Sequence, residues 1–446
     1  MTQATLWLSQ IQFYASLAFL AVFLMMELGL GGLLAYFRIR SLAEPAGPWM
    51  AAYRFWVRVF ALAFVLSFAA GLPVLLQLGS LWPALMSKIG DVAGPLLAAA
   101  LTTVFVFKSC FMGAMLFGER RLSGRAHAAV VVMVAVGTAL MSFWLLALLS
   151  WMHAPEGAVL VGEQYHVIDW ENVIFNPALP WYAGLFAGTA ALVAAFLVMG
   201  VVAAQSLRRP AEPSERLAFR SAVWLALAAI VLQVACTAGG GLIMARYQPA
   251  KAAATAAYWQ SGTQPDLIIA GWPDAASSTN RGTLRWRHAG GRWLGRDSHG
   301  TLLGLDRFAG MAPPVAATFW LYRIALLAGM LLALAAGLTW LEVRRGGYDP
   351  AALSPGWRKL LMALVFGPWA MALAGIAYTL VGAYPFAVAG TITIAEIAGS
   401  ASHRVVAGGL FAYAVLYMLF IAGFLRMLWH TARHGVVPVA RHRGRA

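Results

Sequence analysis

Residues 13–36 read FYASLAFLAVFLMMELGLGGLLAY, and this stretch decides the class of the protein. It carries one charged residue, Glu27, and is otherwise almost entirely apolar. An α-helix needs about 20 such residues to cross a hydrocarbon core of roughly 30 Å. The stretch is too long for the apolar part of a signal peptide, and neither a basic segment nor a small-residue cleavage motif accompanies it. We therefore predict a retained transmembrane helix.

Eight further runs along the chain have the same length and character. The chain is 61% hydrophobic and 11% charged, whereas an average soluble domain is about 25% charged. The sequence therefore predicts an all-α integral membrane protein with nine transmembrane helices. The predicted spans are 13–36, 56–78, 94–118, 129–152, 181–204, 222–244, 315–341, 360–386 and 405–429.

Basic residues gather after every odd-numbered span. The loop after the fourth span is acidic instead, with Glu156, Glu163, Asp169 and Glu171. Loops on the cytoplasmic side of a membrane are enriched in Lys and Arg. We therefore expect a multi-pass protein of the bacterial cytoplasmic (inner) membrane, with its N-terminus outside and its C-terminus in the cytoplasm. The same pattern accounts for the net charge of +15 without a nucleic-acid partner. The basic residues are Arg38, Arg40, Arg120, Arg121, Arg125, Arg208, Arg209, Arg216, Arg344, Arg345, Arg358, Lys359, Arg433, Arg441, Arg443 and Arg445.

The spans divide the chain into three predicted segments. Residues 1–245 hold the first six spans, residues 246–314 form one long extracytoplasmic loop, and residues 315–446 hold the last three spans and a cytoplasmic tail. The two cysteines, Cys110 and Cys236, both fall inside spans and belong to no CxxC motif. This pattern argues against a disulfide framework and a zinc site, and we expect no metal site.

Short motifs occur in order from one end of the chain to the other, and together they resemble subunit I of the cytochrome bd quinol oxidases. The resemblance implies the helical bundle of that family, and it implies that the long loop at 246–314 corresponds to the loop that contacts quinol in the family. The motifs are LSQIQF at 8–13, GERRL at 118–122, FNP at 175–177, YQPAK at 247–251, GWPD at 271–274, TNR at 279–281, FWLYRI at 319–324 and PW at 368–369.

The resemblance also implies where haem ligands belong, and this chain differs at those positions. Members of the family carry three haems, and axial ligands to iron are typically His or Met side chains. Here the positions hold Leu20, Ala325 and Leu373, and the position of a fifth-span His falls at Gly184 or Leu185. Neither Leu, Ala nor Gly offers a side-chain lone pair. We therefore expect no haem in this chain. It resembles a divergent member of the family that lacks the haem ligands.

The quinol-loop motif is only partly retained. Gln248 and Lys251 are present, but the Glu that the resemblance implies five residues after the lysine is Ala256. A Lys–Glu pair can bind a quinol and accept its proton, and Lys251 alone suits that chemistry poorly.

Three charged residues lie inside predicted spans: Glu27, Lys108 and Arg323. Lys108 replaces a Glu that the resemblance implies. At 1.5 Å per residue, Glu27 lies about 21 Å from the outer end of its helix and Lys108 about 15 Å from the inner end of its own. Their depths differ by roughly 6 Å, so an ion pair is plausible; it would be structural, or part of a proton or water path. For Arg323 we expect a lipid headgroup, a carboxylate or a partner chain.

The preferred hypothesis is a haem-free, non-catalytic partner subunit of a bd-type quinol oxidase complex in respiratory electron transport. Haems b and d are then expected in a haem-bearing subunit I-like partner. Membrane lipids are further expected partners, and one alternative adds quinone. Two other hypotheses stay open: an active quinol:oxygen oxidoreductase subunit with unusual haem ligands, and a transporter or quinone-binding protein on the same bundle. Close helix contacts in lipid use small residues, and candidates are Gly239, Gly240, Gly241, Gly375, Gly382, Gly408, Gly409 and Gly423.

Overall fold

The computed structural model describes residues 2–262 and 265–434. The tail arginines Arg441, Arg443 and Arg445 lie outside the described residues. Within the described part, nine helical segments are long and apolar enough to cross a membrane, as predicted. These segments are Gln3–Arg40, Pro48–Ser80, Pro83–Arg120, Gly124–His153, Trp170–Ser206, Pro213–Tyr247, Val315–Val343, Pro355–Val381 and His403–His430.

Six of the segments are continuous α-helices, and three are composite. The continuous helices are α1 (Gln3–Arg40), α2 (Pro48–Ser80), α5 (Gly124–His153), α8 (Pro213–Tyr247), α10 (Val315–Val343) and α14 (His403–His434). The third segment joins α3 (Pro83–Thr103), a π-helical turn η1 (Val104–Ser109), α4 (Cys110–Phe117) and η2 (Gly118–Arg120). The fifth joins the short α6 (Trp170–Ile174) to α7 (Leu179–Ser206). The eighth joins α11 (Pro355–Ala363), η6 (Leu364–Phe366) and α12 (Gly367–Val381).

The eighth span differs from the predicted 360–386. It begins at Pro355 after the N-cap Ser354, whose hydroxyl accepts a hydrogen bond from the backbone of Trp357. It is interrupted at η6, directly before Pro368, because a proline inside a helix removes a backbone donor and crowds the preceding turn. It ends at Val381 and is followed by Gly382, so the final turn of the apolar run lies outside the helix.

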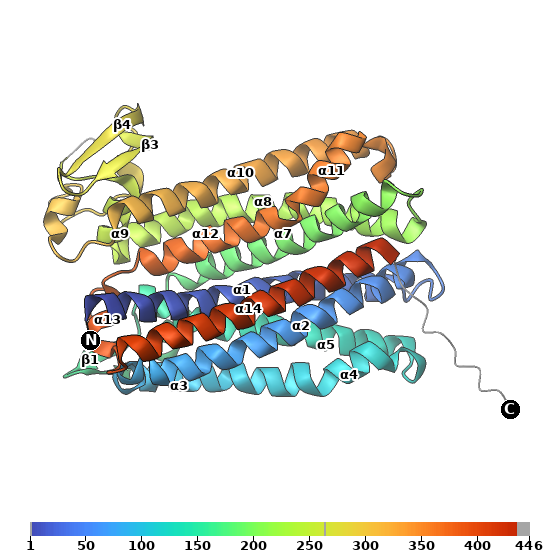
Figure 1. Cartoon of the computed structure of the whole chain (residues 1–446), viewed down its shortest axis with the longest axis horizontal. Coiled ribbons are helices and arrows are strands. Elements are labelled where there is room, and N and C mark those ends of the chain that lie inside the picture. Colours follow the sequence, from blue (N-terminus) through green and yellow to red (C-terminus); the bar gives the residue numbers. More distant parts are fainter. Residues whose placement is uncertain (1, 263–264, 435–446) are drawn as a thin grey trace.

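Helix α1 lies between two groups of helices (Figure 1). On one side of it are α2, α3, α4 and α5, and on the other are α7, α8, α10, α11 and α12; α14 packs along α1 and α2. The span that contains α7 is the most enclosed of the nine. In its most apolar stretch of 18 residues 78% of the residues are buried, whereas in the corresponding stretch of α14 11% are buried. The bundle core is therefore built around α1 and α7, and α14 is peripheral.

Small residues allow α1 and α7 to approach closely. A Cβ added to Gly29 would lie 2.1 Å from the carbonyl oxygen of Ala190, so the two backbones are in direct contact there. Gly200 makes a similar contact with the α11–η6 region, where an added Cβ would lie 2.2 Å from Cγ2 of Val365. Such backbone proximity is how helices pack in lipid.

One end of the bundle carries most of the non-helical structure, together with the N-terminus (Figure 1). The loop predicted at 246–314 lies at this end, on the same side as the N-terminus. It contains α9 (Pro249–Ala256), the antiparallel pair β3 (Leu267–Asp274) and β4 (Thr279–Trp286), and the short turns η3 (Gly291–Trp293) and η4 (Leu305–Phe308). Two other small hairpins and a short helix share this end: β1 (Ala158–Val161) with β2 (Gln164–Val167), β5 (Phe386–Val388) with β6 (Ile392–Thr393), and α13 (Ile394–Ile397). The single turn η5 (Pro350–Ala352) lies between α10 and α11.

Candidate functional site

The four positions where the resemblance implies haem ligands differ in burial. Leu20 is buried in the large hydrophobic core beside Phe19 and Phe23 of its own helix. Ala325 on α10 is half-buried, and Leu373 on α12 is 46% exposed on the outer surface of the bundle. These side chains offer iron no lone pair, and they lie in different environments.

The helix α7 position is closed by a neighbour from α8. A Cβ at Gly184 would lie 2.3 Å from Sγ of Cys236, so a larger side chain there requires that thiol to move. Leu185 is half-buried, and its carbonyl oxygen accepts a hydrogen bond from Nε2 of Gln233 at 3.1 Å. The residues present at all four positions therefore do not fit haem ligation. Among the described residues, no group of three or more His, Cys, Asp or Glu side chains could hold a metal ion.

The structure brings Glu27 and Lys108 together in the middle of the bundle. Oε1 of Glu27 lies 2.8 Å from Nζ of Lys108, and the two side chains are 0% and 2% exposed. The carboxylate also accepts hydrogen bonds from Oγ of Ser67 at 2.5 Å and from Oγ1 of Thr138 at 3.0 Å. Residues of α1, α2, η1 and α5 thus meet at one fully buried carboxylate.

The π-helical turn η1 positions Lys108. π-Turns inside α-helices are rare and occur often at functional sites. Here the turn presses against α5 at Gly137, where an added Cβ would lie 2.4 Å from Cβ of Phe107 and 3.4 Å from Cγ of Lys108. The ammonium group lies 5.2 Å from the centre of the Phe64 ring and 3.5 Å from Sδ of Met141. Apart from Glu27, its surroundings are therefore weakly polar.

Depth along the helices predicted that this pair was within reach, but the two hydroxyl groups were not foreseen. Ser67 and Thr138 are common residues in apolar helices, and no sequence spacing relates them to Glu27. Their hydroxyls also lie 3.0 Å and 3.1 Å from carbonyl oxygens of their own helices, those of Phe64 and Val134. The cluster can hold four helices together, because its opposite charges are paired and both carboxylate oxygens accept hydrogen bonds.

The second polar cluster surrounds Lys251 at the base of the long loop. Lys251 is buried on α9, and its Nζ donates to the carbonyl oxygen of Thr379 at 3.4 Å. It lies 4.6 Å from the centre of the Tyr378 ring, with no carboxylate beside it. Burial lowers the pKa of Lys251 to about 7, because a low-dielectric environment disfavours the charged amine.

Helices α5 and α12 complete this cluster with residues that the sequence motifs did not include. The Nδ1 atom of His153 lies 2.8 Å from the carbonyl oxygen of Leu149, and its Nε2 lies 3.5 Å from the same Thr379 oxygen that Lys251 contacts. The hydroxyl of Tyr378 lies 2.9 Å from that of Thr255 on α9. His153 is the last residue of α5. Only the folded chain places it beside a residue so distant in sequence.

Gln248 occupies the joint between α8 and α9. It is the C-cap of α8 and the N-cap of α9, and its backbone N–H donates to the carbonyl oxygen of Met244 at 2.8 Å. It is half-buried. Ala256, at the position where the resemblance implies a Glu, is half-buried on the last turn of α9. This site therefore presents an amine, an imidazole and a phenol, without an acid.

Within the described part of the chain, the Arg323 guanidinium donates to four backbone carbonyl oxygens, and its side chain stays partly exposed. The acceptors are Ile269 at 2.8 Å, Thr255 at 2.9 Å, Phe319 at 2.9 Å and Ile268 at 2.5 Å. A guanidinium has five N–H donors in a planar fork and can bridge several acceptors at once. Arg323 therefore fastens α9 and β3 to α10.

The other loop motifs also have structural roles. Asp274 and Arg281 form an ion pair across the β3–β4 hairpin at 2.5 Å. The Asn280 amide donates to the carbonyl oxygen of Ala257 at 2.9 Å and accepts from the indole of Trp259 at 2.9 Å. Ala257 has positive φ at the end of α9, so Asn280 supports the residue that turns the chain out of that helix.

Comparison with known proteins agrees with these features. The family model for cytochrome bd terminal oxidase subunit I matches residues 8–436. The cytochrome bd ubiquinol oxidase subunit 1 of Bacillus subtilis (strain 168) is 28% identical over 96% of this chain and 94% of its own length. The cytochrome bd-II ubiquinol oxidase subunit 1 of Escherichia coli (strain K12) is 26% identical over 62% of this chain and 55% of its own.

The fold also has a solved counterpart. A chain of the bd oxidase from Geobacillus thermodenitrificans superposes with a TM-score of 0.85, covering 97% of this chain and 99% of that chain at 22% sequence identity. The shared architecture therefore extends over all nine membrane segments of the described part. The match to the family model over nearly the whole sequence shows that this multi-pass membrane protein belongs to the cytochrome bd terminal oxidase subunit I family.

Proposed function

We propose that this chain is a haem-free, non-catalytic partner subunit of a cytochrome bd-type quinol oxidase complex. In this proposal it pairs with a haem-bearing subunit I-like chain, which carries haems b and d and reduces oxygen. The proposal rests on one observation, the residues that stand at the four positions where the resemblance implies haem ligands. Leu20, Ala325 and Leu373 cannot bind iron, and Cys236 fills the space beside Gly184.

The centre of the bundle supports the same role. At a position where the resemblance implies a Glu, Lys108 is fully buried against Glu27. Removing one partner of a buried ion pair is strongly destabilising. Lys108 therefore makes an internal contact that stabilises the bundle, at a position that the resemblance links to the haem centre.

The small residues expected at a partner contact divide into two groups. Gly239 and Gly240 pack against Trp181, and Gly241 packs against Trp293, so these three serve contacts within the chain. Gly382 and Gly409 also face side chains of this chain, those of Lys251 and Gln12. A Cβ added to Gly375, Gly408 or Gly423 would meet no atom within 4 Å. We therefore keep α12 and α14 as candidate contacts with the partner, and not α8.

A second candidate function, quinone binding without haem chemistry, is favoured by the Lys251 cluster. An amine whose pKa is about 7 can donate a hydrogen bond to a quinone carbonyl, and the phenol of Tyr378 can do the same. Oxidation of a quinol would still require an electron acceptor in another chain. This role is compatible with the partner-subunit proposal.

A haem measurement on two preparations tests the proposal. The chain is expressed alone and also isolated from its native membrane with all chains that accompany it, and a pyridine haemochrome assay is run on both. We expect no stoichiometric haem in the single chain, and haem together with a second subunit I-like chain in the native preparation. One or more haems per chain in the single-chain preparation would overturn the proposal.

A ligand-restoring variant provides the matched control. Leu20→His supplies an imidazole at one of these positions, so any haem that it gains over the unaltered chain measures the effect of the missing ligand. A native preparation that is a monomer or homodimer with full quinol oxidase activity would equally contradict the partner-subunit role.

A further inference from the structure

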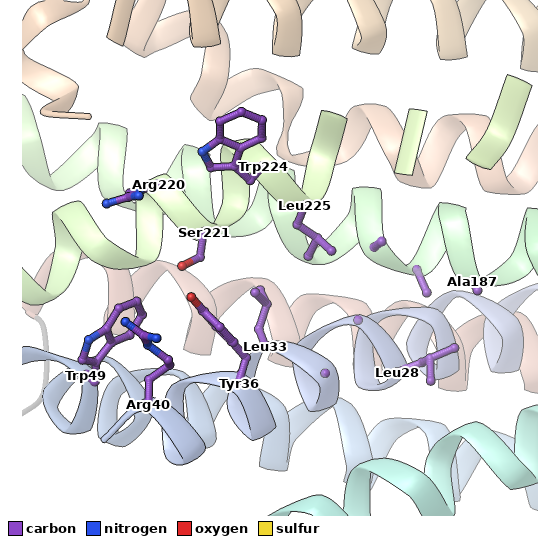
Figure 2. A pocket seen from close by; sticks show the side chains of 14 residues that line it. Leu28, Leu33, Tyr36, Arg40, Trp49, Ala187, Arg220, Ser221, Trp224 and Leu225 are labelled. Atoms are coloured by element: carbon purple, nitrogen blue, oxygen red, sulfur yellow. The ribbon is translucent and has the colours of Figure 1, made fainter. Parts of the chain in front are cut away.

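A cavity of about 620 Å³ opens between α1, α7 and α8 at the end of the bundle opposite the N-terminus (Figure 2). None of the haem-ligand positions and none of the Lys251 cluster lines it. Its size is typical of a site for a small molecule or part of a lipid. The cavity therefore needs an explanation of its own.

The part of the cavity nearer the middle of α1 is apolar, and several of its lining residues are small. Gly32 and Ala187 are exposed in it, and Leu28 and Leu33 contribute the larger side chains. A Cβ added to Gly32 would meet no atom within 4 Å, so the space above it is open. Gly32 lies about 12 Å along α1 from Arg40, at 1.5 Å per residue. This depth places the apolar part within the hydrocarbon region.

The other end of the cavity is polar and cationic. Figure 2 shows Arg40, Tyr36 and Ser221 gathered at one end and Leu28 and Ala187 toward the other. Arg220, from α8, lines the same end. The rims therefore combine two guanidinium groups with two hydroxyl groups, next to a purely hydrocarbon lining.

Both arginines of this end contact aromatic rings. The guanidinium of Arg40 lies 5.4 Å from the Trp49 ring centre, and that of Arg220 lies 5.4 Å from the Tyr348 ring centre. Within the described residues neither forms an ion pair, whereas Arg216, one turn earlier on α8, pairs with Asp349 at 3.2 Å. Aromatic contacts hold the two cations in place and leave their N–H donors available for an anion.

We propose that this cavity binds an anionic phospholipid. One acyl chain lies over Gly32 and Ala187, and the phosphate lies at the cationic end between Arg40 and Arg220. Basic pockets between transmembrane helices recognise lipid headgroups in this way. Charge complementarity favours a lipid over an apolar helix, which would cover the groove but leave both guanidinium groups without a counter-charge. The site is independent of the haem question and of the proposed partner.

The test is a lipid titration of the full chain, together with any chains that accompany it from its membrane. The preparation is stripped of lipid in mild detergent and titrated with palmitoyl-oleoyl phosphatidylglycerol or palmitoyl-oleoyl phosphatidylcholine, and bound lipid is counted by native mass spectrometry. We expect one site that prefers phosphatidylglycerol by roughly tenfold or more. Arg40→Gln and Arg220→Gln should each weaken its binding about fivefold, and Gly32→Leu should weaken both lipids by filling the groove.

Arg121→Gln is the matched control, because Arg121 is an exposed cation in the loop after η2 and does not line the cavity. It should leave phosphatidylglycerol binding unchanged. Equal binding of the two lipids, with no effect of Arg40→Gln or Arg220→Gln, would overturn the proposal. So would a photo-crosslinking residue placed at Tyr36 that captures a polypeptide and no phospholipid in native membranes. The arginine variants alter partly exposed side chains, so they remain decisive if Gly32→Leu fails to fold.

Discussion

Removing the buried carboxylate of Glu27 should be among the most damaging single substitutions in this chain. Glu27→Leu leaves the Lys108 ammonium with a sulfur atom at 3.5 Å and an aromatic ring at 5.2 Å as its nearest described polar contacts. Breaking a buried ion pair by removing one partner costs about 3–5 kcal/mol. No discount for solvent applies, because both side chains are 2% exposed or less.

Removing the cation should cost less. Lys108→Met leaves the carboxylate with two hydroxyl donors, Ser67 at 2.5 Å and Thr138 at 3.0 Å. Hydrogen bonds to a charged group contribute about 1.5–3 kcal/mol each, so part of the charge stabilisation persists. We expect a loss of about 2–3 kcal/mol, which is below the range of about 3–5 kcal/mol for a broken buried pair.

The double variant Glu27→Leu with Lys108→Met should recover most of the loss. Replacing a whole buried pair by apolar residues of similar volume is often neutral or stabilising. The two hydroxyls stay satisfied, because each also reaches a carbonyl oxygen of its own helix. We expect the double variant within about 1 kcal/mol of the natural chain, so the coupling between the two sites is several kcal/mol.

Thermal unfolding in mild detergent, followed by tryptophan fluorescence, measures these differences. At roughly 1–2 °C per kcal/mol for a chain of this length, Glu27→Leu should lower the apparent Tm by about 3–10 °C. Ser67→Ala removes one hydrogen bond to the carboxylate and should cost about 1.5–3 kcal/mol, less than Glu27→Leu. The reasoning is refuted if the double variant is as unstable as Glu27→Leu. A double variant of normal stability that abolishes activity of the assembled complex would instead favour a proton path through this cluster.

Four further outcomes follow from the same structure. A reporter fused after Ala446 should be active only in the cytoplasm, and periplasmic activity would contradict the predicted topology. Burial lowers the pKa of Lys251 from 10.5 to about 7, so between these pH values the unfolded chain binds more protons than the folded chain. Stability should therefore rise as the pH increases from about 7 to 10. Lys251→Met should flatten that rise in pH-dependent melting curves. Arg323→Met removes four hydrogen bonds to backbone carbonyls and should speed proteolytic cleavage of the loop at 257–312, with little change elsewhere. Gly408→Leu should reduce co-purification of the partner if α14 is the contact. Gly409→Leu should instead destabilise the isolated chain, because its Cβ would lie 3.1 Å from Gln12. Equal effects of the two variants on co-purification and on stability would remove α14 as the interface.

The membrane-spanning architecture could be predicted from the sequence because it depends on local composition. A run of about 20 apolar residues must form a helix in lipid, where each backbone polar group needs a partner within the same segment. All nine predicted spans therefore reappear in the described part of the chain. The family was also recognisable from ordered motifs, and the family model and the fold comparison agree with it.

Element ends were less predictable. The eighth span was expected to continue to residue 386, but it ends at Val381 and is broken near Pro368. Apolar residues continue past the end of the helix because they also line the turn and strand that follow. Hydropathy reports which residues avoid water, and it does not report which of them are helical.

Only the tertiary structure decided what the charged and small residues contact. Within this chain Arg323 donates to three carbonyl oxygens of the loop and to one of its own helix, contacts that its position in the sequence did not predict. Gly241 was a candidate contact for another subunit, and it packs against Trp293 of this chain. Such contacts join segments that are remote in sequence, and the free energy that selects them arises only when the helices pack. Residue type and depth predicted that Glu27 and Lys108 lie within reach of each other, and only the packed helices brought the hydroxyls of Ser67 and Thr138 to the same carboxylate.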